Sequence, residues 1–282
     1  MNGLKNKIAV VTGGSRGVGK GIAKGLAEQG AIVYITGRTV DKDNADAPLS
    51  GTINETAKEV NELGGVGIPY QCDHRNDEEV RKLFKKIKNE YGNLDILVNN
   101  VWAGYENIYQ VNKPEEYIFE DNFWEQPISL WDDMFDVGLR SHYVASKFAV
   151  PLMLEQNSGL IVNISFFAGR RYMSNVAYGV CKAAVDRLTK DMAHELKDDG
   201  IASVSLYPGM VRTEGVMRNK DILDLSNSES PMFIGRAVAA LAQDKKIIKE
   251  TGNILIAAEV AKEYNFTDID GKQPESLRKA LW

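Results

Sequence analysis

The stretch IAVVTGGSRGVGKGIAKGLA, residues 8–27, decides how this chain folds. An apolar run at residues 7–12 leads directly into a glycine-rich turn, TGGSRGVG at residues 12–19, and a helical pattern follows over residues 17–29. Glycines permit positive φ angles and close approach of the backbone, and the unpaired N–H groups at a helix start attract anions. Glycines also form ordinary turns, but a turn between a first strand and a helix predicts a pyrophosphate site.

Short apolar runs alternate with longer amphipathic segments along the rest of the chain. Further strands are predicted at residues 31–36, 67–72, 94–99, 160–165, 202–207 and 253–257, and further helices at residues 53–63, 77–91, 130–156, 174–197 and 231–243. Several runs are nearly continuous in Val, Ile and Leu, as in parallel strands covered on both faces. We therefore expect an α/β fold, a Rossmann-type doubly wound parallel sheet of about seven strands, as one domain over residues 1–282.

Two stretches interrupt this alternation. Residues 103–129 are rich in aromatic side chains, and residues 214–230 are polar and follow Pro208-Gly209. Long segments without a clear element in a compact domain are usually lids or mobile loops. We expect both to be insertions that line a substrate pocket. The alternative is ordinary surface packing, which has more weight for residues 103–129 than for residues 214–230.

The composition limits the class of protein. The chain has 282 residues, 44% hydrophobic and 26% charged, with a formal net charge of -5, which disfavours nucleic acid and anionic membranes as partners. No signal peptide is recognisable, and no window reaches the roughly 18 apolar residues of a membrane span. Two cysteines, Cys72 and Cys181, and three scattered histidines indicate a reducing compartment and no metal site. We expect a cytoplasmic enzyme or binding protein.

The end of the second strand, ITGR at residues 35–38, bears on which dinucleotide is bound. Folds of this type usually place an acidic residue there, which binds the ribose 2′-hydroxyl of NAD. Arg38 stands there instead, and with Arg16 in the glycine turn it can hold a 2′-phosphate through charge-assisted bonds. Either arginine alone could be a solvated surface charge, but together they favour NADP(H) over NAD(H).

Tyr178 and Lys182 lie one turn apart within a helical pattern and therefore on the same face. This spacing is common by chance, but here it follows a glycine turn and a fifth strand. A free tyrosine titrates near 10, and nearby positive charge lowers its pKa towards working pH. The pair is thus suited to acid–base catalysis.

With TGGSRGVG at 12–19, NNVWAG at 99–104, YGVCK at 178–182 and PGMVRT at 208–213, the sequence resembles the short-chain dehydrogenase/reductase family over nearly its whole length. The resemblance implies that Tyr178 is the general acid in reduction and the base in oxidation, and that Lys182 holds the nicotinamide ribose. It implies a homodimer or homotetramer packed through the helices at 130–156 and 174–197. The cofactor-binding residues would be Gly13, Ser15, Arg16, Gly17, Val18, Gly19, Arg38, Asp73, Asn99, Asn100, Tyr178, Lys182, Pro208, Gly209, Val211 and Thr213.

Two positions depart from the family's pattern. The family adds a catalytic serine, and counting back from Tyr178 gives Ser165, whereas alignment through its ISSxAG pattern gives Phe166. Adjacent strand residues point to opposite faces, so the two alignments differ chemically, and we assign Ser165. Gly138 stands where the family has an asparagine that anchors a water in its proton relay.

The sequence therefore predicts an NADP(H)-dependent oxidoreductase, a carbonyl reductase or alcohol dehydrogenase that moves a hydride between nicotinamide and a small-molecule carbonyl or alcohol. The aromatic residues of the first insertion favour a bulky or apolar substrate. One alternative is an NADP(H)-binding sensor or scaffold with weakened catalysis, suggested by Gly138 and the uncertain serine. Another is an enoyl-type or epimerase reaction, because a fold does not fix its reaction.

Overall fold

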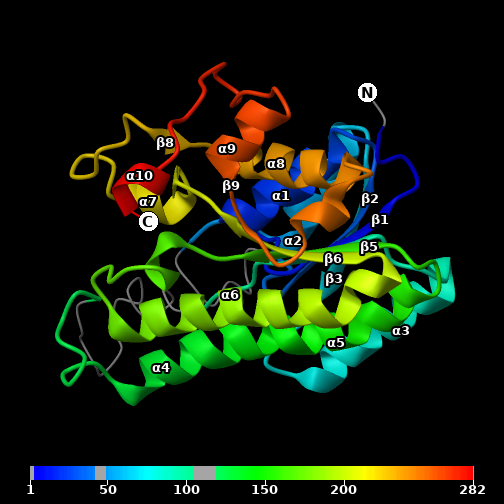
Figure 1. The fold of residues 1–282 in the computed structure, drawn as a ribbon, viewed down its shortest axis with the longest axis horizontal. Helices are drawn as coiled ribbons and strands as arrows, with labels where there is room; N and C mark the ends of the chain where they lie inside the picture. The colour runs from blue at the N-terminus through cyan, green and yellow to red at the C-terminus, as the bar shows by residue number, and fades with distance from the viewer. Residues whose placement is uncertain (1–2, 42–48, 104–118, 282) are drawn as a thin grey trace.

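Val-, Ile- and Leu-rich runs form the strands of a parallel sheet. The computed structural model describes residues 3–41, 49–103 and 119–281, and within these ranges seven strands pair in the order β3-β2-β1-β4-β5-β6-β9 (Figure 1). The expected doubly wound sheet is thereby confirmed. Its strands are β1 (Ile8–Val11), β2 (Ile32–Gly37), β3 (Val66–Gln71), β4 (Ile96–Asn99), β5 (Gly159–Ile164), β6 (Ile201–Tyr207) and β9 (Ile254–Ile256).

Helices cover both faces of this sheet (Figure 1). One face carries α1 (Gly17–Ala27), α2 (Ile53–Glu62), α8 (Pro231–Gln243) and α9 (Ala257–Glu263). The other face carries α3 (Asp77–Tyr91), α4 (Ile128–Phe135), α5 (Ser141–Leu154) and α6 (Val176–Leu196). Smaller elements follow β6 and end the chain: β7 (Met210–Val211), α7 (Glu214–Arg218), β8 (Ser228–Glu229) and α10 (Arg278–Leu281).

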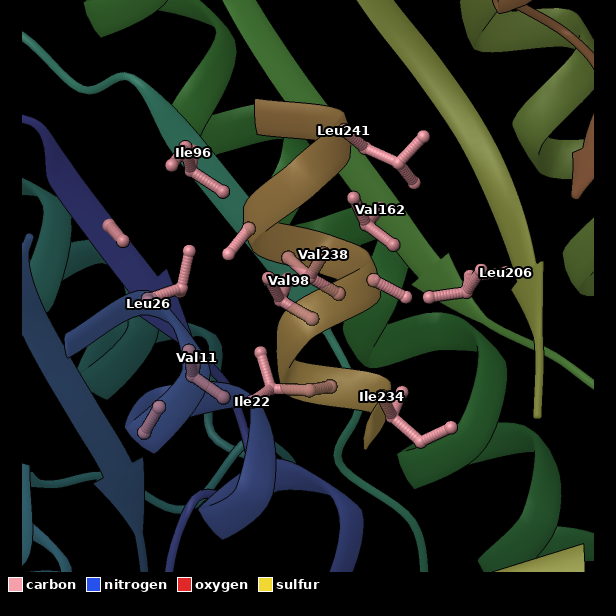
Figure 2. Close-up of a cluster of buried hydrophobic side chains, with 14 of the residues drawn as sticks. Val11, Ile22, Leu26, Ile96, Val98, Val162, Leu206, Ile234, Val238 and Leu241 are labelled. Carbon is pink, nitrogen blue, oxygen red and sulfur yellow. The ribbon is translucent and has the colours of Figure 1, made fainter. Parts of the chain in front are cut away.

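The apolar core between the sheet and α1 and α8 fixes the start of α1. Figure 2 shows side chains of both helices over the strands, and the labelled residues are Val11, Ile22, Leu26, Ile96, Val98, Val162, Leu206, Ile234, Val238 and Leu241, all buried. Burying one such side chain stabilises the fold by about 1.5–3 kcal/mol. The helices cross closely, since a Cβ at Gly25 would lie 2.2 Å from the carbonyl carbon of Gly235.

The predicted helix at 130–156 is wrong in one detail. The chain is helical from α4 through α5, but residues Asp136–Arg140 form a turn of π helix between them. The sequence pattern did not predict this turn, because the buried residues around it, Met134, Val137, Gly138 and Ser141, still recur three or four positions apart. Such turns are rare and occur frequently at functional sites. Gly138 lies in it.

The two predicted insertions differ. Of the first, residues 104–118 lie outside the described residues. The second, residues 214–230, was expected to be irregular but contains α7 and β8. None of the helices within the described ranges is long and apolar enough to cross a bilayer.

Candidate active site

The glycine turn folds tightly over the end of β1. Gly13 has a φ of +66°, and a Cβ at Gly19 would lie 2.2 Å from the Gly13 carbonyl oxygen. Only glycine fits at position 19, so the first turn of α1 comes directly against the strand end. Asn100 braces the turn, because its side-chain amide donates to the carbonyl oxygens of Thr12 (2.9 Å) and Gly13 (3.1 Å).

A cavity of about 650 Å³ lies at the carboxyl ends of the strands, beside the helix start. The strand order reverses between β1 and β4, and ligands of doubly wound sheets bind at such a point. The positive end of α1 and the glycine-rich turn fit the phosphates of a dinucleotide. Of the predicted cofactor-binding residues, the cavity is lined by Gly13, Ser15, Arg16, Gly17, Val18, Gly19, Arg38, Asp73, Asn100, Tyr178, Lys182, Pro208, Gly209, Val211 and Thr213.

Asn99, unlike the other predicted cofactor-binding residues, does not line the cavity. Its side chain is fully buried in the interior and donates to Ser146 Oγ of α5 (3.0 Å) and Asn163 Oδ1 of β5 (2.8 Å). Asn163 in turn donates to Thr189 Oγ1 of α6 (2.9 Å). Successive strand side chains alternate between faces, so Asn99 joins the strands to α5 and α6 while Asn100 reaches the turn.

Two arginines line the end of the cavity beside β2. Arg16 donates through Nη2 to Thr39 Oγ1 (3.1 Å) and to the Gly51 carbonyl oxygen (3.4 Å), and Arg38 directly follows β2. No carboxylate ends this strand, since its last residue is Gly37.

Asp73 and His74 follow the end of β3 and line the cavity, and the sequence reasoning missed His74. Asp73 Oδ1 accepts from the N–H of Arg75 (3.0 Å). The Nε2 atom of His74 lies 2.7 Å from Thr36 Oγ1, and burial lowers the pKa of His74 to about 4, so its ring is neutral near pH 7. This wall of the cavity is therefore polar without a histidine charge.

Glu214 is a second cavity residue absent from the predicted set. Its Oε2 accepts a hydrogen bond from the N–H of Gly17, the first residue of α1, at 2.9 Å. The N-terminus of a helix attracts negative charge. A carboxylate of the chain itself thus sits where the helix offers a site to an anion.

Tyr178 and Lys182 are brought together as predicted. Asn175 caps the start of α6, and its side chain accepts a hydrogen bond from the Tyr178 N–H (3.0 Å). Tyr178 and Lys182 are both buried and line the cavity. Lys182 Nζ donates to the Ile164 carbonyl oxygen (3.4 Å), and burial lowers the pKa of Lys182. The rings of Trp102 and Phe119 pack edge-on against Tyr178, with centroids 5.5 and 5.8 Å away.

Ser165 and Phe166 both line the cavity but are oriented differently. The Ser165 hydroxyl donates to the backbone carbonyl of Lys182 (3.2 Å) and also interacts with Asp186. The Phe166 ring lies 6.3 Å from that of Tyr178. Ser165 is therefore near the predicted pair, and its role as a third catalytic residue stays a prediction.

The Pro208-Gly209 turn is held by Glu229 of β8. The Glu229 side chain is buried, and its Oε2 accepts from the Gly209 N–H (2.8 Å). Burial raises the pKa of Glu229 to about 7. Nothing local in the sequence indicated this contact, because the two residues are 20 positions apart.

The pKa of Glu229 makes stability depend on pH. Because it rises from 4.5 in the unfolded chain to about 7 in the fold, the folded protein binds the extra proton, and stability falls as pH rises through this window. A glutamine keeps the acceptor for Gly209 without a charge. At pH 8 we expect Glu229→Gln to be more stable than wild type by up to about 3 kcal/mol of unfolding free energy, and therefore to unfold at a higher temperature. At pH 4.5 we expect no such difference.

Thermal unfolding at both pH values, with Glu195→Gln on the exposed side of α6 as control, measures this effect. An equal difference at the two pH values would contradict a buried, titrating Glu229.

Among the residues that the structure describes, no group of three His, Cys, Asp or Glu side chains is arranged to hold a metal ion.

Comparison with known proteins identifies the family. The model of the short chain dehydrogenase family matches residues 7–222. Dehydrogenase/reductase SDR family member 1 of Mus musculus is 42% identical, over 95% of this chain and 85% of its own length, and the Homo sapiens protein is 41% identical, over 96% and 85%. A crystal structure from Xanthomonas campestris, assigned as a dehydrogenase, superposes with a TM-score of 0.77 at 25% identity, covering 95% of this chain and 92% of that one. Fold, cavity and relatives agree, and this chain belongs to the short-chain dehydrogenase/reductase family of NAD(P)-dependent oxidoreductases.

Proposed function

We propose that this protein is an NADP(H)-dependent carbonyl reductase, and in reverse an alcohol dehydrogenase, acting on bulky or apolar substrates. The observation that carries the proposal is that Tyr178 and Lys182 lie on one face of α6 and line the same cavity as the glycine turn. Both residues are buried. A general acid–base must reach the reacting oxygen, and this cavity is where substrate and cofactor can meet.

The chain's own residues divide the work. The Tyr178 hydroxyl gives a proton to the carbonyl oxygen in reduction and takes it from the alcohol in oxidation. The Lys182 ammonium favours the Tyr178 phenolate, because opposite charge stabilises the ionised form, and burial strengthens that attraction. Ser165 is the third catalytic residue in this proposal. A nicotinamide bound in the cavity supplies or accepts the hydride.

The preference for NADP(H) rests on Arg16 and Arg38. Both line the cavity beside the end of β2, where a ribose 2′-phosphate would carry about two negative charges. Arginine binds phosphate through two parallel hydrogen bonds. Arg38 stands where folds of this type usually place an acid, so the acidic side chain that would repel this phosphate is replaced by a basic one.

The substrate preference rests on the apolar surroundings of Tyr178. Trp102, Phe119, Phe166 and Met173 pack around it, and all four line the cavity. Such a lining favours apolar ligands with few polar groups.

Assembly and location belong to the same proposal. We expect a homodimer or homotetramer packed through α5 and α6, whose exposed surfaces carry Tyr143, Val176 and Val180. We expect the enzyme to work in the cytoplasm as one domain over residues 1–282, with residues 103–129 and 214–230 bordering the substrate.

Replacing Tyr178 tests the reaction. Tyr178→Phe removes the proton donor and should lower turnover by about 100-fold or more, in a protein that still binds NADPH. The measurement is NADPH oxidation against a panel of ketones, aldehydes and quinones, with Tyr91→Phe as a matched control. Undiminished turnover in Tyr178→Phe would exclude the assigned donor. NADPH binding without turnover by the wild type would favour a sensor or scaffold instead.

Replacing Arg38 tests the choice of cofactor. Arg38→Asp should weaken NADPH binding roughly 10- to 100-fold, because a charge-assisted contact is lost and a repulsion gained, and should leave NADH binding unchanged or tighter. Titration of nicotinamide fluorescence with both cofactors measures this, and Arg38→Lys, which keeps the charge, should lose less. Equal losses for NADPH and NADH would contradict a 2′-phosphate site.

Replacing Glu214 tests the competition at the start of α1. Its carboxylate accepts from Gly17, so it must leave that N–H before a cofactor phosphate can bind there. Glu214→Gln should tighten the Kd of NADPH and NADH alike, by about three- to tenfold, since the diphosphate is common to both. Glu263→Gln, exposed on α9, is the control. Weaker binding in Glu214→Gln would mean that the carboxylate supports the cofactor.

A further inference from the structure

Trp102 lies between the π-helical turn and the Tyr178–Lys182 pair. Its ring centroid is 4.1 Å from Lys182 Nζ and 5.5 Å from the ring centroid of Tyr178. It follows β4 within the NNVWAG segment and lines the cavity. One side chain thus contacts both members of the pair.

Gly138 provides the space in which the Trp102 ring sits. A Cβ at position 138 would lie 2.3 Å from Cζ3 and 2.5 Å from Cε3 of that ring, and 3.4 Å from Cys181 Sγ. Real Cβ atoms do not approach that closely, so any side chain at 138 would displace the indole. The π turn and its glycine therefore hold Trp102 against Lys182.

The groups around Lys182 explain what the ring does there. On α6 itself, Asp186 and Cys181 favour the charged lysine, but Asp186 is already engaged by the Tyr207 hydroxyl. On α5, His142 is neutral near pH 7, because burial and the lysine charge lower its pKa to about 3. On β5, only a backbone carbonyl accepts from Nζ. Within the described ranges, no carboxylate lies within 4.0 Å of Lys182 Nζ.

We propose that Trp102 is a positioning residue whose indole face, seated on Gly138, keeps the buried Lys182 ammonium charged and in place beside Tyr178. The face of an aromatic ring carries negative charge and attracts a cation, more strongly when water is excluded. The charged lysine in turn favours the Tyr178 phenolate. This inference rests on the proposed function of Tyr178 and Lys182.

The direction of the effect follows from these charges. Without the ring, Lys182 releases its proton more readily, because burial already disfavours its charge. Tyr178 then loses a positive neighbour and holds its own proton to higher pH. Trp102→Leu keeps apolar bulk but removes the ring, and Trp102→Phe keeps a smaller ring.

Titration of Tyr178 tests this directly and needs no turnover. In protein carrying tyrosine labelled with ¹³C at Cζ, the resonance missing from Tyr178→Phe identifies Tyr178. We expect Trp102→Leu to raise its titration midpoint by about one pH unit, and Trp102→Phe by less. Trp131→Leu, on the surface of α4, is the matched control and should leave the midpoint unchanged. A midpoint in folded Trp102→Leu no higher than in wild type overturns the proposal.

Gly138→Ala gives a second route, which applies even if Trp102→Leu does not fold. The added methyl group should push the ring off Lys182 and raise the same midpoint while the tryptophan is kept. If the two residues act through one contact, Gly138→Ala/Trp102→Leu should raise it no further than Trp102→Leu alone. Additive shifts, or no shift in Gly138→Ala, overturn the assigned role of Gly138.

A pH profile of alcohol oxidation separates this inference from the proposed function. In the variants that shift the NMR midpoint, the rise of kcat with pH should move upward equally. Turnover with an unmoved Tyr178 midpoint leaves the reductase proposal standing and overturns the role of Trp102. A shifted Tyr178 midpoint in a protein without turnover supports the role of Trp102 and overturns the reductase proposal.

Discussion

The contact between Gly19 and the carbonyl oxygen of Gly13 is the constraint on which the rest of the site depends. Because a Cβ at 19 would lie 2.2 Å from that oxygen, α1 can begin directly above β1 only with glycine there. The core beneath α8 holds α1 in this position, and Asn100 ties the turn to the end of β4. The N-terminus of α1, the ends of β1 and β4, and the face of α6 that carries Tyr178 and Lys182 consequently meet at one cavity.

Hydrogen bonds between ionisable side chains and backbone groups, at the cavity and beside it, are the second constraint. Lys182 donates to the carbonyl of Ile164, Glu214 accepts from the N–H of Gly17, and Glu229 accepts from the N–H of Gly209. A buried charge without such partners would cost several kcal/mol. The Glu214 and Glu229 contacts join segments distant in sequence, so the charges that serve the site also fix its shape.

These long-range contacts mark where prediction from the sequence ends. The sheet and the glycine turn could be predicted, because strand burial and positive φ leave local patterns. Asn99 was predicted to bind the cofactor, and the alternation of side chains along β4 turns it towards Asn163 in the interior. Glu214 reaches Gly17 across 197 positions, which no local pattern encodes. The π turn was not predicted, because the buried residues around it still recur three or four positions apart.

Gly138 is the residue whose interpretation the structure changes most. Compared with the family's pattern, Gly138 replaces an asparagine, and the loss of that polar side chain is a reason to doubt catalysis. In the fold, the same glycine makes room for Trp102, which the lengthened NNVWAG segment carries to Lys182. The Trp102 ring and the missing side chain at position 138 share one volume, because a Cβ at 138 would lie 2.3 Å from Cζ3 of that ring. The ring takes up space beside the buried Lys182 Nζ, and in a low-dielectric environment a charge on Lys182 acts more strongly on Tyr178.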